Sequence, residues 1–199
     1  MRSPMGTVLH MTSQRHTDDA LLDAARDCVV EVGVRRTTLT DVAKRAGVSR
    51  MTLYRRFPDI NSLVRTLMTR EFTTLLHTID DTTTGTARDH LVHHAVAAIR
   101  LLTRNPLLRR VLDLDADLML PYLVERLGST QLLVEQFLIT QLEAGHQDGS
   151  IRQGDPKTQA RLVLLTTQSL VLSHRPATTD LDFDTLLDEL TLYLNAALT

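Results

Sequence analysis

Residues 47–57 read Gly47-Val48-Ser49-Arg50-Met51-Thr52-Leu53-Tyr54-Arg55-Arg56-Phe57. A glycine is favoured where a helix ends in a left-handed residue, and a serine two residues later is typical of the N-cap of the next helix. The four-residue spacing of Leu53 and Phe57 places both on one helix face, toward the core, with Val48 beside them. The outer face then shows an aromatic ring, a hydroxyl and guanidinium groups. This pattern predicts the second helix of a helix-turn-helix, which enters the major groove of DNA.

Two further helices are predicted before this stretch. The first begins after its N-cap Thr17, follows helical apolar spacing and ends at Gly33. Its apolar positions include the single cysteine, Cys28, which predicts a buried thiol that serves packing. The second helix covers residues 39–46, because Thr38 and Asp41 have the spacing of a capping box. Together with the helix after Ser49, these two form a three-helix head over residues 17–63.

The rest of the chain also has helical spacing. Asp59 caps a long helix from Ile60 to about Asp80, and further helices are predicted near 87–103, 106–127 (broken around 115–121), 129–145, 156–174 and 181–198. No stretch shows the alternation of a strand, so the predicted fold is all-α. Residues 1–16 are polar and aperiodic, which predicts a flexible tail, or a basic arm through Arg2 and Arg15. Residues 64–199 form a larger helical domain.

The distribution of charged residues along the chain indicates what kind of partner the protein binds. Residues 1–70 hold 12 Lys+Arg against 7 Asp+Glu, whereas residues 71–199 hold 10 against 17. A basic head on an acidic remainder indicates a polyanion partner for the head. No apolar run approaches the roughly 18 residues that span a bilayer, no secretory signal is seen, and one cysteine fits a reducing compartment. We therefore expect a cytoplasmic protein.

Two motifs identify a family. Residues 37–49 read Thr-Thr-Leu-Thr-Asp-Val-Ala-Lys-Arg-Ala-Gly-Val-Ser, and residues 52–58 read Thr-Leu-Tyr-Arg-Arg-Phe-Pro. Over residues 17–76 the chain resembles the TetR family of transcriptional regulators, and beyond that only the architecture is similar. The resemblance implies an all-helical homodimer with a DNA-binding head and a ligand-binding, dimerising remainder. One departure is Ile60, at a position where the family usually carries a phosphate-contacting lysine.

Eight residues are expected to contact DNA. The guanidinium groups of Arg50 and Arg55 suit bidentate contact with guanine, and Met51 suits a thymine methyl group. Tyr54 resembles the family tyrosine that touches phosphate or a base edge. The phosphate contacts that fix register are expected from Thr38, Thr52, Arg56 and Lys44. For Arg56 and Arg45 the alternative is a solvated or ion-paired role, and for Lys44 it is a solvated surface charge.

The larger domain is less informative. By resemblance, helices near 129–145 and 156–174 pair with those of a second chain; the alternative is that they pack within one monomer. The candidate ligand contacts are His94, Tyr122 and Gln168. No metal site and no cofactor are predicted, because His90 and His94 have no third ligand placed beside them. Asp113, Asp115 and Asp117 lack the glycine and glutamate of a calcium loop, so we expect a solvated acidic loop, with a cationic ligand as the alternative.

Two other classes of function were weighed. Glu143 and His146 have the E-x-x-H spacing of di-iron helical bundles, but only one copy occurs and the chain shows no nucleophile–base pattern. A helix-turn-helix activator or architectural protein is the second alternative. The sequence favours a repressor, not an enzyme, that a small-molecule inducer releases from a near-palindromic operator on double-stranded DNA. An inducer would stabilise a conformation that holds the two heads at the wrong spacing.

Overall fold

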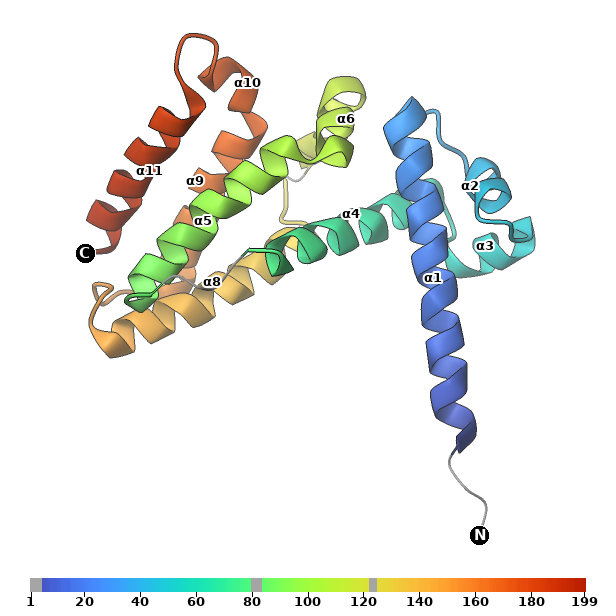
Figure 1. Cartoon of the computed structure of the whole chain (residues 1–199), viewed down its shortest axis with the longest axis horizontal. Helices are drawn as coiled ribbons and strands as arrows, with labels where there is room; N and C mark the ends of the chain where they lie inside the picture. The colour runs from blue at the N-terminus through green and yellow to red at the C-terminus, as the bar shows by residue number, and fades with distance from the viewer. Residues whose placement is uncertain (1–4, 80–83, 122–124) are drawn as a thin grey trace. The chain divides into compact units, whose positions relative to one another are not determined.

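The computed structural model describes residues 5–79, 84–121 and 125–199, with side chains from Asp18 onward. Its elements are α1 (Met5–Val32), α2 (Leu39–Arg45), α3 (Arg50–Arg56), α4 (Ile60–His77), α5 (Ala87–Arg104), α6 (Pro106–Leu114), the 3-10 helix η1 (Ala116–Met119), α8 (Ser129–Asp148), α9 (Pro156–Leu172), α10 (His174–Ala177) and α11 (Phe183–Leu198) (Figure 1). Within these residues no strand occurs, which confirms the predicted all-α fold.

The chain divides into two compact units. The first contains the residues up to Arg70 together with Arg109–Leu118, and the second contains Glu71–Leu108 and Met119–Thr199. The predicted border after residue 63 differs from this division. Residues 109–118 join the first unit because they hydrogen-bond to the end of α1, a contact that spans about 80 residues of sequence and leaves no local signal.

Helix α1 begins at Met5, so the predicted start at Thr17 is wrong. The sequence from Thr7 to Val32 contains neither proline nor glycine, and nothing in it therefore interrupts the helical hydrogen bonds. The predicted flexibility of residues 1–16 stays a prediction. The end of the helix is as predicted, because Gly33 has a φ of +87°, which glycine adopts without strain.

The core of the first unit joins its helices through apolar side chains. Leu21 and Val29 of α1, Val42 of α2, Leu53 of α3 and Leu63 of α4 are almost completely buried. Each buried leucine contributes about 1.5–3 kcal/mol relative to an exposed one. The Cys28 thiol is buried in this core, as predicted, and burial raises its pKa.

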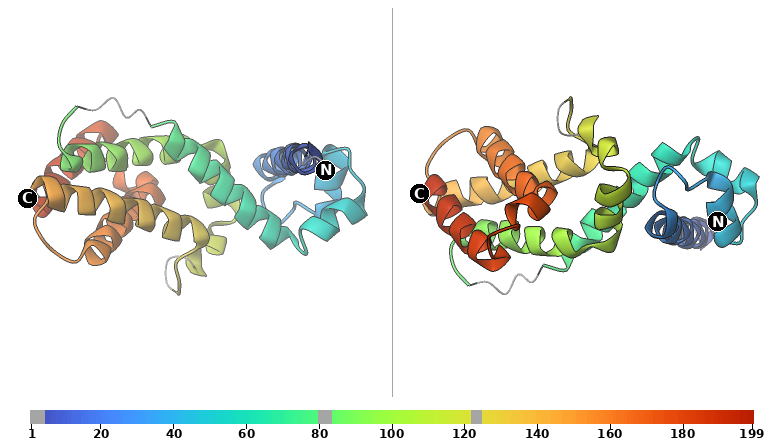
Figure 2. Two further views of the ribbon diagram at one scale, coloured as in Figure 1. Left: turned by 90° about the horizontal axis from the view of Figure 1, so that it is seen from below. Right: turned by 90° about the horizontal axis from the view of Figure 1, so that it is seen from above.

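The second unit is built from α5, α8, α9 and α11, which pack side by side (Figure 2). Their buried faces supply its core, which includes Leu91, Ile99, Leu142 and Leu187. The predicted helices 156–174 and 181–198 correspond to α9, which ends at Leu172, and α11, which begins after Asp182. The short helix α10 lies between them, at the predicted break. None of the helices in the described ranges is both long and apolar enough to cross a membrane.

Side-chain caps begin three helices of the second unit, α5, α9 and α11. Thr86 and Asp89 form a complete capping box at α5, Asp155 accepts from the Thr158 N–H at 2.7 Å, and Asp182 accepts from the Thr185 N–H at 2.8 Å. These bonds satisfy donors that a helix start otherwise leaves open. They also lower the pKa of each carboxyl: the backbone N–H is the larger cause at Asp89 and Asp182, and the Thr158 hydroxyl at Asp155.

Candidate nucleic-acid interface

The turn between α2 and α3 has the predicted geometry. Gly47 has a φ of +67°, and no atom lies within 4 Å of where its Cβ would stand, so the glycine is needed for backbone conformation and not for space. The Val48 N–H donates to the Ala43 carbonyl at 3.0 Å. Ser49 then caps α3, because its hydroxyl accepts from the Thr52 N–H at 3.1 Å. These contacts set the direction in which α3 leaves the turn.

Helix α3 has one buried and one exposed face. Leu53 is fully buried, and Phe57 at the C-cap is 6% exposed. On the other face Met51 is 77% exposed and Tyr54 is 49% exposed. The orientation predicted from the spacing of Leu53 and Phe57 is therefore confirmed, and a ring, a thioether and two guanidinium groups project from one short helix.

The cations of the head fall into two groups. Arg50, Arg55 and Lys44 are exposed, and within the part of the chain that the structure describes they have no hydrogen bond or ion pair. By contrast, Arg45 pairs with Glu31 at 2.6 Å, and Arg56 pairs with Asp18. The first group is free to meet phosphate or base edges without first breaking an intramolecular contact. Arg56 must exchange its carboxylate partner for a phosphate.

Both threonines that are predicted to contact DNA take part in helix caps, Thr38 as the N-cap of α2 and Thr52 as the partner of the α3 N-cap Ser49. The Thr38 hydroxyl accepts from the Asp41 N–H at 3.2 Å and donates to the Asp41 carboxylate at 2.5 Å. The Thr52 hydroxyl lies 2.9 Å from the Ser49 hydroxyl. The predicted capping box at α2 is thus half formed, because the second bond comes from the Thr38 hydroxyl and not from its backbone N–H.

The start of α4 carries no cation. Asp59 caps the helix by accepting from the Ser62 N–H at 2.6 Å, and half-buried Ile60 follows it. A capping carboxylate already uses one of the N–H groups that a phosphate would need at this helix start.

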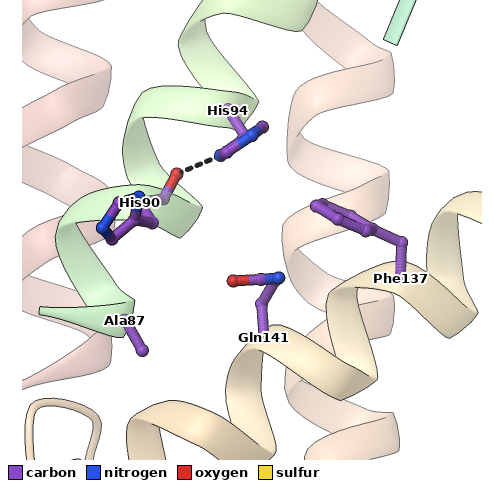
Figure 3. A pocket seen from close by; sticks show the side chains of 5 residues that line it. All are labelled: Ala87, His90, His94, Phe137 and Gln141. Carbon is purple, nitrogen blue, oxygen red and sulfur yellow. Dashed lines mark hydrogen bonds between the residues drawn. The ribbon is translucent and has the colours of Figure 1, made fainter. Parts of the chain in front are cut away.

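The second unit contains a hollow of about 360 Å³ between α5 and α8, lined by Ala87, His90, His94, Phe137 and Gln141 (Figure 3). The His94 ring lies 5.7 Å from that of Phe137. Its Nδ1 lies 2.7 Å from the His90 carbonyl oxygen. Because a carbonyl can only accept, Nδ1 carries the proton, and a neutral His94 keeps Nε2 as an acceptor.

Gln168 is not brought to this hollow. Gln168 of α9 accepts from the Gln131 side chain of α8, so it joins two packed helices and does not line the hollow. Tyr122 lies outside the described residues. His94 is the candidate that lines this hollow.

The acidic cluster differs from expectation. Asp113 and Asp117 are exposed, but Asp115 is 2% exposed and accepts from the Val34 N–H at 2.7 Å. The expectation of a solvated loop is wrong for Asp115, because a distant backbone donor meets its carboxylate. In the E-x-x-H pair, His146 contacts Gln159 at 2.8 Å while Glu143 is exposed. No group of three or more metal-binding side chains occurs among the described residues.

Comparisons with known proteins agree with the head and the fold. A family model described as "Bacterial regulatory proteins, tetR family" matches residues 21–67. The uncharacterized HTH-type transcriptional regulator Rv2250c of Mycobacterium tuberculosis is 36% identical over 192 residues, which cover 96% of this chain and all of that protein. Among solved structures, the transcriptional repressor QsdR of R. erythropolis, from the TetR family, has a TM-score of 0.68 at 14% identity over 93% of this chain and 97% of that one. FadR of Bacillus subtilis in complex with stearoyl-CoA has a TM-score of 0.64 at 19% identity, covering 90% of this chain and 98% of that one.

Proposed function

The chain belongs to the TetR family of bacterial regulatory proteins and is a helix-turn-helix transcriptional regulator, and we propose that it is a repressor that a small molecule releases from its operator. The observation that carries the proposal is the outer face of α3, where Arg50, Met51, Tyr54 and Arg55 are exposed around a buried Leu53. The relatives and fold neighbours are regulators, not enzymes. Such a protein acts in the compartment that holds the bacterial chromosome, the cytoplasm.

Base reading is assigned to the guanidinium groups of Arg50 and Arg55, which have no partner among the described residues. An arginine that has no intramolecular partner keeps its fork of donors for guanine O6 and N7. Met51 adds apolar contact to a thymine methyl group, and Tyr54 contacts phosphate or a base edge. Register is set by phosphate contacts from Lys44, Thr38, Thr52 and Arg56, which do not depend on the base sequence.

A homodimer is proposed through α8 and α9. These helices pack against each other and are joined by the ion pair of Glu135 and Arg161, 2.5 Å apart, which lowers the pKa of Glu135. Residues three and four apart share a helix face, so Leu132 and Leu165 flank this pair, and both are about half exposed. Leu133, Phe137 and Leu162 add further exposed apolar surface on the same helices. Large apolar side chains that are exposed in such number support an interface with another protein.

Two symmetric heads would read two half-sites, so the operator is expected to be near-palindromic. The dimer is tested by the mass in solution of the wild type and of two leucine variants. Leu165→Glu should give monomers, because it places a carboxylate on the proposed interface. Leu192→Glu on α11 is the matched control, since Leu192 is even more exposed but lies outside α8 and α9. A dimer that survives Leu165→Glu and is lost in Leu192→Glu would contradict the assignment.

The second unit is proposed to bind the effector. The hollow beside His94 combines an imidazole acceptor, a phenyl ring and an amide, a mixture that is typical of small-molecule sites. Its volume of about 360 Å³ lies near the lower end for such sites. The structural neighbour solved with stearoyl-CoA has its fold in common with this chain, which supports a ligand-responsive second unit without specifying the ligand. An effector that binds one conformation better than another shifts the heads away from operator spacing.

The central experiment measures binding to DNA that flanks the protein's own gene, across a series of salt concentrations. A repressor should form a sequence-selective complex whose affinity falls steeply with salt, and added metabolites should be screened for release. The absence of any selective complex at moderate salt would overturn the proposal. A complex that no half-site symmetry explains, or that raises transcription, would favour the activator or architectural alternative.

A further inference from the structure

Asp115 is a buried carboxylate with specific partners in the first unit. Its Oδ2 accepts from the Val34 N–H at 2.7 Å, and its Oδ1 lies 3.7 Å from Nε of Arg35. A buried carboxylate is costly unless such partners compensate it. The side chain therefore holds the residues that follow α1 firmly, and it does so from the residue that follows α6.

Two neighbouring contacts join the same two segments. Arg110 of α6 donates through Nη2 to the Glu31 carbonyl at 2.6 Å, which satisfies one of the open acceptors at the end of α1. The approach is close: a Cβ on Gly33 would lie 2.8 Å from Oδ2 of Asp115 and 2.9 Å from Cδ1 of Leu114. Arg35 also pairs with exposed Asp117. The end of α6 is thus seated directly on the α1–α2 turn, defined as residues 33–38.

The α1–α2 turn leads directly into α2, and its hydrogen bonds fix where α2 begins. The Thr37 N–H donates to the Val34 carbonyl at 3.1 Å, and the buried Thr37 hydroxyl donates to the Gly33 carbonyl at 2.7 Å. Thr38 then caps α2, and α2 packs on α3. Thr37 is thus hydrogen-bonded to both Gly33 and Val34, so a shift of Val34 would move Thr37 and, with it, the N-cap of α2.

Helix α6 is continuous from Pro106 to Leu114, although residues up to Leu108 belong to the second unit and residues from Arg109 belong to the first. Its start is fixed by Asn105, which accepts from the Leu108 N–H at 2.9 Å. We infer that Asp115 is a positioning residue for DNA binding: by holding the Val34 N–H it couples the placement of α2 and α3 to the state of α6. The inference rests on the proposed DNA-binding function and extends it to a named coupling contact.

Coupling between two sites is reciprocal, so operator DNA itself serves as the probe. Hydrogen exchange is followed in peptides from 33–38 and 106–114, with and without a duplex selected by the wild-type protein. In the wild type, bound duplex should slow exchange in both segments. In Asp115→Ala, affinity for the duplex should fall roughly 5- to 150-fold, the usual range of such couplings, and the response of 106–114 to DNA should vanish. The salt dependence of binding should stay the same, because no phosphate contact is removed.

Two further variants separate coupling from loss of folding. Asp115→Asn retains an oxygen that can accept from the Val34 N–H, so it should keep the response of 106–114 and lose less affinity than Asp115→Ala. Asp117→Asn removes an exposed ion pair and should behave like the wild type. The inference is overturned if bound duplex leaves 106–114 unchanged in the wild type, or if Asp115→Ala keeps the wild-type response. A wild type that binds no duplex would instead overturn the proposed function itself.

Discussion

Helix α3 of the first unit and helices α8 and α9 of the second unit both expose large side chains, but of opposite chemistry. Helix α3 presents unpaired guanidinium groups around a phenol and a thioether, whereas α8 and α9 present leucine and phenylalanine side chains around an ion pair that joins the two helices. Charge left free of intramolecular partners suits a polyanion. Apolar surface suits a second copy of the protein. The contrast supports the proposal that one chain has separate surfaces for DNA and for assembly.

The largest effects on stability are expected from substitutions in the hydrophobic cores of the two units. Leu53 of the first unit and Leu142 of the second are both fully buried, so truncation of either to alanine should cost about 2–5 kcal/mol of stability. If the units are energetically separate, Leu53→Ala should speed hydrogen exchange in α1–α3, and Leu142→Ala should speed it in α5 and α8. Equal losses of protection throughout the chain in both variants would show a single cooperative unit.

The next effect concerns reading of sequence. Arg50→Ala should weaken binding to the selected duplex by roughly 1–3 kcal/mol and relax the preference at one base position. Lys44→Ala, its exposed control on α2, should weaken binding to all duplexes alike and reduce the salt dependence. Competition with single-base variants of the duplex measures both. Unchanged affinity and preference in Arg50→Ala would remove Arg50 from the groove.

A smaller effect on DNA binding is expected from adding a cation at the start of α4, which has none. Ile60→Lys places an ammonium group at the start of α4, where the family usually carries a lysine. Because each added phosphate contact releases counterions, the slope of log affinity against log salt should steepen by about 0.9. The uncharged control Ile60→Met should leave the slope unchanged. An equal slope in all three proteins would mean that α4 does not approach the backbone.

The smallest expected effect is the loss of folding stability at low pH. In the second unit, α9 and α11 begin at the carboxylates of Asp155 and Asp182, and Asp89 lies in the first turn of α5. N–H and hydroxyl donors lower the pKa values of these three carboxyls. The N-caps of α2 and α3 in the first unit are hydroxyls. A group with a lowered pKa in the folded state stabilises fully above its ordinary value of 3.8 and loses this contribution as pH falls through its folded pKa. We expect the second unit to lose more stability than the first below about pH 4.

Asp182→Asn provides the test, since asparagine caps a helix about as well as aspartate but does not titrate. The difference in unfolding temperature between pH 6 and pH 3 should become smaller than in the wild type. The same substitution at Asp188, which is exposed within α11, should leave that difference nearly as it was. If the unfolding temperature of Asp182→Asn falls between pH 6 and pH 3 by as much as that of the wild type, this cap is not a source of acid sensitivity.

Local patterns predicted the head well, and long-range contacts were beyond them. Gly47, Ser49, Leu53 and Phe57 act through neighbours within four residues, so their spacing alone predicts the turn, the cap and the buried face. Asp115 meets Val34 across 81 residues, and no pattern near Asp115 indicates that partner. The hydrogen bond between the side chains of Gln131 and Gln168 likewise depends on the packing of α8 on α9. The early start of α1 was missed because polar sequence without apolar spacing can still continue a helix.

The buried Cys28 has a practical consequence for spectroscopy. It is the single cysteine of the chain, it is 7% exposed, and burial raises its pKa. The thiolate is the form that attacks a maleimide, so the unmodified protein should react slowly with a maleimide dye. A cysteine introduced at an exposed position such as Met51 or Leu192 would then carry the label almost alone. The chain is therefore suited, without removal of its own cysteine, to fluorescence measurements that follow each unit separately.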